Sequence, residues 1–198
     1  MNEAITRTDI KNFNNDGVVV LRGVFKDWIE VLRRGAEFHI NHPSESALIH
    51  KQDSYQGQFM EDFCNWQRIA EYKDFVLNSP IGSFAADLTG SKSIQFFHDH
   101  FFYKEASSGF STPWHQDMPY YCIAGLQTVS FWMPLESREQ SVSLKCAAGS
   151  HSFSKEIRQQ AGLITRAFMK IMKHSWTCQI LTMIILKLSS GRLSRVML

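Results

Sequence analysis

Residues 112–121 read Thr-Pro-Trp-His-Gln-Asp-Met-Pro-Tyr-Tyr and place the imidazole of His115 two positions before the carboxylate of Asp117. On an extended strand, residues two apart point to the same face, with their Cα atoms about 7 Å apart. This separation allows the two side chains to chelate one ion. Imidazole nitrogen and carboxylate oxygen are typical ligands of Fe(II). By itself, such a triplet is more often a hydrogen-bonded pair on a surface strand, so the neighbouring sequence must decide between this pair and a metal site.

The surroundings of this triplet favour β-structure. From Ser93 to Tyr103 the sequence is aromatic, and His98 and His100 share one face of the expected strand. On such a strand, buried histidines with hydrogen-bond partners are more common than metal ligands. The sequence predicts strands over residues 93–103, 112–118, 127–135 and 141–147.

The first ninety residues favour helices instead. A helix is expected over residues 8–15, and Asp27 is expected to cap a second one that ends before Pro43, with Glu30 completing a capping box. Helices followed by short strands imply an α+β fold in which a sandwich or barrel carries the site. The other expectations are a strand at 18–21, a surface loop over 44–65, a helix stopping near Pro80 and a helix closed by Gly90.

The composition indicates one globular domain, because 198 residues that are 44% hydrophobic and 20% charged can bury one core. The apolar stretch from Ile180 to Leu188 is much shorter than the roughly 20 residues of a membrane span. Residues 1–16 lack the apolar stretch of a signal peptide. The four cysteines are widely spaced, which favours free thiols. We therefore expect a cytoplasmic protein with no membrane span.

The net charge of +2 conceals an uneven distribution. Residues 157–198 carry seven Lys or Arg and no acidic residue, since the last one is Glu156. Such a tail commonly indicates a nucleic acid or an anionic surface. It could form a basic amphipathic helix, with Phe168 and Ile171 opposite Lys170. We expect no nucleic-acid partner, because a change of reading frame accounts for the same composition.

Three motifs together resemble the phytanoyl-CoA dioxygenase family. They are the stretch at 112–121, Gly-Leu-Gln-Thr-Val-Ser-Phe-Trp-Met-Pro-Leu at 125–135, and Ala-Gly-Ser-His at 148–151. Their order and spacing match the family, and the similarity runs from about Asp9 to Ile157, most specifically from Phe97 to His151. The resemblance implies a double-stranded β-helix, or jelly roll, that follows N-terminal helices and binds Fe(II) and 2-oxoglutarate.

The same resemblance assigns roles to five residues. It makes His115 and Asp117 the first two metal ligands, and a carboxylate at position 117 indicates hydroxylation, because halogenating relatives have a small residue there. Thr128 and Trp132 would line the cosubstrate pocket, and Lys104 could face a carboxylate of 2-oxoglutarate. The partners implied are a small organic substrate and molecular oxygen. The Ala-Gly-Ser-His motif is interpreted as a turn, with its histidine in packing contact and not a ligand.

The family pattern breaks after Asp117. The family has a distal histidine beyond a Pro-Gly-Asp turn, followed by an arginine that pairs with 2-oxoglutarate, whereas His174 stands in no matching context here. Read from the third base of each codon, Met169-Lys170 forces Glu and Met183-Ile184 forces Asp. The same frame permits Pro-Gly-Asp across residues 190–198. A frame shift near Arg158 therefore explains the basic tail.

These observations give one expected organisation and two expected functions. Residues 1–157 would comprise the helices and the first part of the oxygenase domain, and residues 158–198 an out-of-frame tail that leaves the barrel incomplete. The first function is an Fe(II)- and 2-oxoglutarate-dependent dioxygenase that hydroxylates a small organic substrate, impaired by loss of the distal histidine and arginine. The alternative is a non-catalytic binding module or inactive fragment. The sequence carries no signal for the oligomeric state.

The frame hypothesis makes a prediction about the gene. Sequencing through codon 198 should reveal an inserted or deleted base near codons 158–161. An uninterrupted frame over these codons would show that the basic tail is genuine.

Overall fold

The computed structural model describes residues 4–105, 108–109, 112–122, 125, 127–137, 143–153 and the backbone of 181–188. Helices dominate the first half of this part of the chain, and strands the second. The elements are α1 (Arg7–Asp16), the 3-10 helix η1 (Lys26–Trp28), α2 (Ile29–Asn41), β1 (Leu48–His50), β2 (Phe59–Phe63), α3 (Ala70–Asn78), α4 (Ile81–Thr89), β3 (Gln95–Lys104), η2 (Met118–Tyr120), β4 (Thr128–Pro134), η4 (Ser150–Ser152) and β5 (Leu181–Leu188).

The strands form one sheet with the order β1-β2-β3-β5-β4. β1, β2 and β3 pair antiparallel, and β5 pairs parallel with both β3 and β4. The described strands do not close into a barrel. The predicted α+β class is confirmed, and the sheet of this part of the chain is open.

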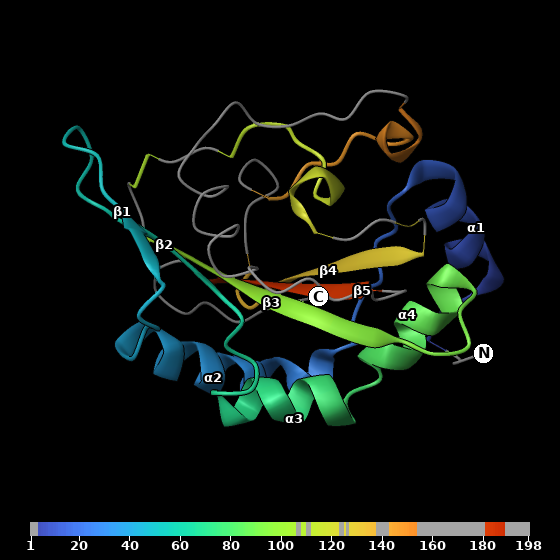
Figure 1. Cartoon of the computed structure of the whole chain (residues 1–198), viewed down its shortest axis with the longest axis horizontal. Helices are drawn as coiled ribbons and strands as arrows, with labels where there is room; N and C mark the ends of the chain where they lie inside the picture. Colours follow the sequence, from blue (N-terminus) through green and yellow to red (C-terminus); the bar gives the residue numbers. More distant parts are fainter. Residues whose placement is uncertain are drawn as a thin grey trace.

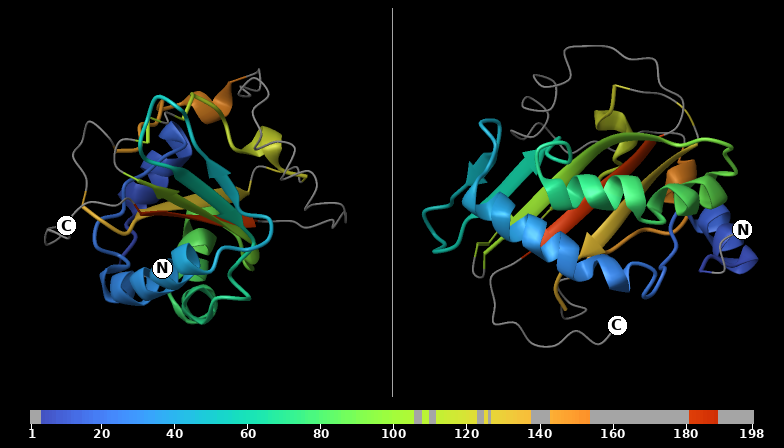
Figure 2. Two further views of the ribbon diagram at one scale, coloured as in Figure 1. Left: turned by 90° about the vertical axis from the view of Figure 1, so that its left-hand side faces the viewer. Right: turned by 90° about the horizontal axis from the view of Figure 1, so that it is seen from below.

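The sheet separates a helical layer from a layer of loops. Helices α2 and α3 lie against one face, and η2 and η4 lie beyond the other (Figure 1). Seen from below, α2 and α3 run side by side across the strands (Figure 2). The buried core lies between helices and sheet, and burial of its large aromatic side chains contributes to hydrophobic stabilisation. It includes Tyr72, Phe75, Phe84, Phe101 and Phe131.

A buried pair formed by His39 and Asp62 ties α2 to the sheet. His39 Nε2 lies 2.8 Å from Asp62 Oδ2, and both side chains are fully buried. The Ser44 amide and hydroxyl also donate to this carboxylate, at 2.8 and 2.7 Å. Burial raises the pKa of Asp62, but the hydrogen bonds from His39 and Ser44 outweigh burial and hold the pKa well below its ordinary value. The carboxylate is therefore a charged anchor inside the core.

All four helices predicted in the first ninety residues are confirmed, as are two of the predicted strands. The helices expected before Asp16, Pro43, Pro80 and Gly90 correspond to α1 to α4, and the strands at 93–103 and 127–135 to β3 and β4. Gly90 ends α4 in the left-handed conformation, at φ 65°. This conformation favours glycine, which explains why the stop signal was reliable.

Four local predictions are wrong. Residues 18–21 form no strand: Val19 and Leu21 pack against the core, Val20 is exposed, and the segment has no ladder partner. The expected loop at 44–65 contains β1 and the fully buried β2, whose charged residues concealed the pattern. Residues 112–118 form no strand either, since Pro113 and Pro119 remove backbone donors. In the fourth segment, residues 143–147 have no strand partner in the described part of the chain.

The expected capping box at Asp27 is also absent. Asp27 lies inside η1, and no side chain caps the start of α2. Glu30 instead forms an ion pair with Arg33, whose Nη1 lies 2.6 Å from its Oε1. The short 3-10 turn starts this helix in place of a side-chain cap.

Most of the basic tail, including the alternative amphipathic helix around Phe168, lies outside the described residues. The exception is β5, whose backbone forms the strand between β3 and β4. None of the helices in the described ranges combines the length and apolar character needed to cross a bilayer.

The buried anchor predicts an acid-sensitive stability. Asp62→Asn should lower the free energy of unfolding at pH 7 by about 2–4 kcal/mol, measured by urea denaturation, because His39 then loses its charged partner. The folded pKa of Asp62 is lowered, so its contribution is present above the unfolded pKa of about 3.9 and is lost as pH falls further. The variant should therefore lose less stability than the wild type between about pH 5 and 2.

A matched control is Asp74→Asn, which alters an exposed carboxylate that accepts a hydrogen bond from Asn78 at 2.7 Å. It should change stability by less than about 0.5 kcal/mol. Equal losses for the two variants would contradict the role of Asp62 as a buried anchor.

Candidate metal centre

A turn, and not a strand, brings His115 and Asp117 together. Residues 112–116 have no ladder partner, and Asp117 has helical backbone angles, φ −72° and ψ −42°, at the start of η2. As a result His115 Nε2 lies 3.3 Å from Asp117 Oδ1. The two side chains are 29% and 35% exposed, so solvent and ions can reach them.

The backbone orients the imidazole of His115. Its Nδ1 lies 2.8 Å from the carbonyl oxygen of Pro113, and the ring of Tyr120 packs edge-on against it. When Nδ1 carries the proton donated to this carbonyl, Nε2 can offer its lone pair on the side of Asp117. The hydrogen bond to Asp117 raises the pKa of His115, and partial burial opposes this effect.

The donor set fits a divalent metal ion. Two ligands each about 2.1 Å from one octahedral ion lie about 3 Å apart, and the separation in this chain is 3.3 Å. A nitrogen and a carboxylate oxygen also form part of the two-histidine, one-carboxylate set of non-haem Fe(II) enzymes. Among the described residues, no group of three or more His, Cys, Asp or Glu is placed to hold a metal. This part of the chain therefore brings together two candidate donor atoms, His115 Nε2 and Asp117 Oδ1.

Of the residues expected to hold the cosubstrate, Thr128 lies near His115 and Asp117, and Lys104 lies far from them along the sheet. The hydroxyl of Thr128 donates to Sδ of Met118, the residue after Asp117, at 3.3 Å. Trp132 lies on the same face of β4 as Thr128. Lys104 ends β3, and its Nζ lies 5.1 Å from the ring centroid of Phe59. The structure thus brings Thr128 beside the pair, whereas the strand register puts Lys104 towards the other end of the sheet.

A buried polar cluster lies on the loop side of the sheet. Glu61 is fully buried, with Oε1 2.7 Å from His50 Nε2 and Oε2 3.3 Å from His100 Nε2. His98 and His100 share this face as predicted, and burial lowers the pKa of both, that of His98 to about 4. Both imidazoles are therefore neutral at physiological pH.

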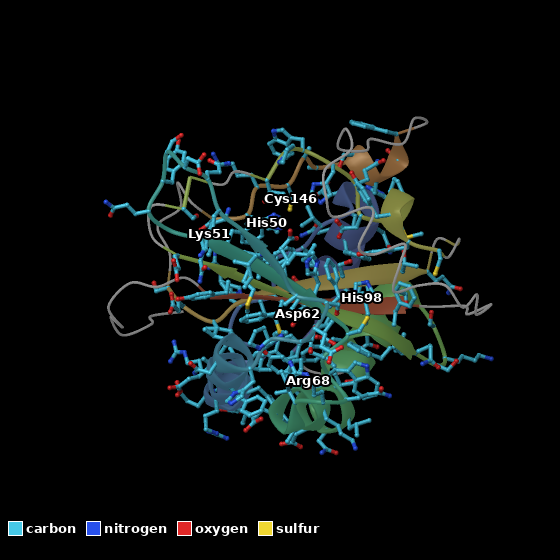
Figure 3. The ribbon with its side chains drawn as sticks, turned by 60° about the vertical axis from the view of Figure 1, so that its left-hand side comes forward. His50, Lys51, Asp62, Arg68, His98 and Cys146 are labelled. Atoms are coloured by element: carbon cyan, nitrogen blue, oxygen red, sulfur yellow. The ribbon has the colours of Figure 1, made fainter. Side chains whose placement is uncertain are left out.

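In Figure 3, the labelled polar residues lie on both sides of the sheet. His50 and Cys146 lie on the loop side, whereas Arg68 lies on the side of the helices, next to the layer that contains Asp62 (Figure 3). Burial, followed by the charge of Asp117, raises the pKa of Cys146. This thiol is therefore neutral at physiological pH.

Sequence reasoning missed Glu61. Its signal is the period-two pattern of Phe59, Glu61 and Phe63, which places the carboxylate between two buried aromatic rings on one face of β2. A charged residue in such a pattern indicates a buried pair when histidines are available on the neighbouring strands.

The paired geometry makes a prediction for the metal-free protein. The imidazole of His115 should titrate above its ordinary value of about 6.5, because Asp117 stabilises the protonated ring. Asp117→Asn should move the midpoint down, measured by the pH dependence of the imidazole proton shifts. Asp53→Asn, which changes an exposed carboxylate between β1 and β2, should leave it in place. An unmoved midpoint in Asp117→Asn would show that the two side chains do not interact in solution.

Comparison with known proteins gives one match. A family model described as phytanoyl-CoA dioxygenase matches residues 13–176, well over half of the chain, and this range includes His115 and Asp117. Among curated proteins and among solved structures, no match was found. The match agrees with the resemblance carried by the three sequence motifs. The chain therefore belongs to the phytanoyl-CoA dioxygenase family.

Proposed function

We propose that this chain has the active site of an Fe(II)- and 2-oxoglutarate-dependent dioxygenase, with His115 and Asp117 as two of the metal ligands. The observation that carries the proposal is the 3.3 Å approach of His115 Nε2 to Asp117 Oδ1 in a chain of this family. The substrates would be a small organic molecule, which is hydroxylated, and molecular oxygen. The open sheet would form part of a jelly roll.

The residues around the pair have distinct tasks in this proposal. Bound iron with 2-oxoglutarate supplies the oxygen activation needed for hydroxylation. Asp117 occupies a position that a carboxylate must fill for hydroxylation, and the Pro113 carbonyl holds the His115 ring in its binding orientation. Thr128 and Trp132 form the cosubstrate wall, whereas Lys104 lies towards the other end of the sheet and takes no part in the site.

The metal affinity is expected to be weak. No residue after Asp117 stands in the sequence context of the family's distal histidine or arginine. Two protein ligands with no arginine for the cosubstrate should give little turnover. The free thiols of Cys64, Cys122 and Cys146 support the cytoplasmic location proposed from the sequence.

Metal titration tests the ligand assignment. Under anaerobic conditions, His115→Ala and Asp117→Ala should each weaken Fe(II) binding by about 10-fold or more, followed by tryptophan fluorescence. His42→Ala, which changes an exposed histidine stacked on Phe38, should have no effect. His174→Ala should have none either, because this histidine lacks the context of a ligand.

Succinate release from 2-oxoglutarate separates the two expected functions. Slow release that requires iron and disappears in Asp117→Ala would support the dioxygenase. Fe(II) binding of equal strength in the wild type and in both alanine variants would refute the proposed site. Iron binding without any succinate release would favour the non-catalytic module.

A further inference from the structure

The loop that carries the metal pair is tied to a distant turn by the residue between the two candidate ligands. Gln116 Nε2 donates to the carbonyl oxygen of Ser150 at 2.7 Å, across 34 positions of sequence. Ser150 lies in the Ala-Gly-Ser-His motif, where Gly149 has φ 78° and starts η4. The motif therefore presents a fixed backbone acceptor to the loop.

The same turn is fastened to the end of α1. The amide of Gly149 donates to the carbonyl oxygen of Asp16 at 2.7 Å. The ring of His151 lies directly against Gly17, where an added Cβ would come within 2.3 Å of the ring nitrogen Nδ1. Gly17 has φ 71° and caps α1 in the left-handed conformation. Only glycine meets both the conformational and the steric requirement at this position.

Helix α1 is itself held at both ends. Thr6 and Asp9 form a capping box at its start, and the amide of Gly17 donates to Phe13 at 2.8 Å at its end. Ile10 and Phe13 pack against the buried core. The turn at 149–151 is therefore fastened to an element that the core keeps in place.

The loop that carries His115 and Asp117 needs such support because it has little regular secondary structure of its own. Residues 112–116 have no strand partner, and η2 is three residues long. On the side after Asp117, the loop is held by Thr128 through Met118 and by Tyr121, whose ring packs edge-on against His98. On the other side, Gln116 makes the connection to Ser150.

We propose that Gln116, residues 149–151 and the Asp16–Gly17 end of α1 act as a brace that positions His115 and Asp117 for metal binding. The inference rests on the proposed metal role of this pair. The brace fixes the peptide between the two ligands, so it sets the angle at which their donor atoms converge. Gln116 and Gly17 are positioning residues, because they act through the two ligands.

The first test compares Gln116→Met with Gln127→Met in the full chain, using Co(II) under anaerobic conditions as the probe. Methionine keeps the length of glutamine but cannot donate a hydrogen bond. Gln127 donates to the Thr89 carbonyl at 3.3 Å and to the Ser91 hydroxyl at 3.1 Å, so the control loses a similar bond. Gln116→Met should weaken Co(II) binding by about 10-fold or more and alter the visible spectrum. Gln127→Met should change neither.

A second test acts on the brace from its far end. Gly17→Ala forces the His151 ring and its turn away, and should reproduce the weaker Co(II) binding of Gln116→Met. Adding His151→Gly removes the clash while the strain of a left-handed alanine stays. The double variant should regain most of the affinity, although its melting temperature stays low. Loss of stability alone would give no such recovery.

A metal-free measurement completes the design. The amides of Tyr120 and Tyr121 donate to Asp117 and Met118, both at 3.0 Å, and should exchange hydrogen several-fold faster in Gln116→Met than in Gln127→Met. Equal Co(II) affinities in these two variants, with binding lost in Asp117→Ala, would overturn the brace and leave the proposed function standing. If Asp117→Ala binds Co(II) like the wild type, the proposed function fails, and the exchange rates alone decide whether the brace holds the turn.

Discussion

Two adjacent carboxylates on β2, those of Glu61 and Asp62, constrain how the helical layer and the three antiparallel strands pack together. Because side chains alternate along a strand, Asp62 points towards the helices and Glu61 towards the loops. Neither can be buried without a partner, since an isolated charge in the core is very costly. His39 satisfies Asp62 from α2, while His50 and His100 approach Glu61 from β1 and β3. The helical layer and the three antiparallel strands are thereby fixed to the same short segment.

This constraint places the candidate metal pair. β3 carries Phe101 into the helical core and presents His98 and His100 to the opposite face. The ring of Tyr121, just after η2, packs against His98, and Met118 contacts Thr128 on β4. The loop with His115 and Asp117 is therefore seated on a surface whose geometry the buried pairs determine. Electrostatic coupling reflects this proximity, since the charge of Asp117 acts on both histidines of β3.

The convergence of His115 and Asp117 has a different origin from the one expected. Strand alternation predicts parallel side chains, whereas the structure has a helical turn that starts at Asp117. Across this turn, His115 Nε2 and Asp117 Oδ1 approach to 3.3 Å. The local reason expected for this convergence is wrong, because prolines on both sides of the motif prevent a strand.

The sequence alone determined the features that depend on neighbouring residues. The helix that ends at Gly90, the alternation of Val129, Phe131 and Met133 in β4 and the family motifs all follow from short-range patterns. Tertiary structure decided the features that depend on distant partners. Burial of Glu61 required histidines on other strands, and the hydrogen bond from Gln116 to Ser150 joins segments that are 34 positions apart. A single sequence encodes periodicity locally, but whether a buried charge or amide finds its partner depends on how the whole chain packs.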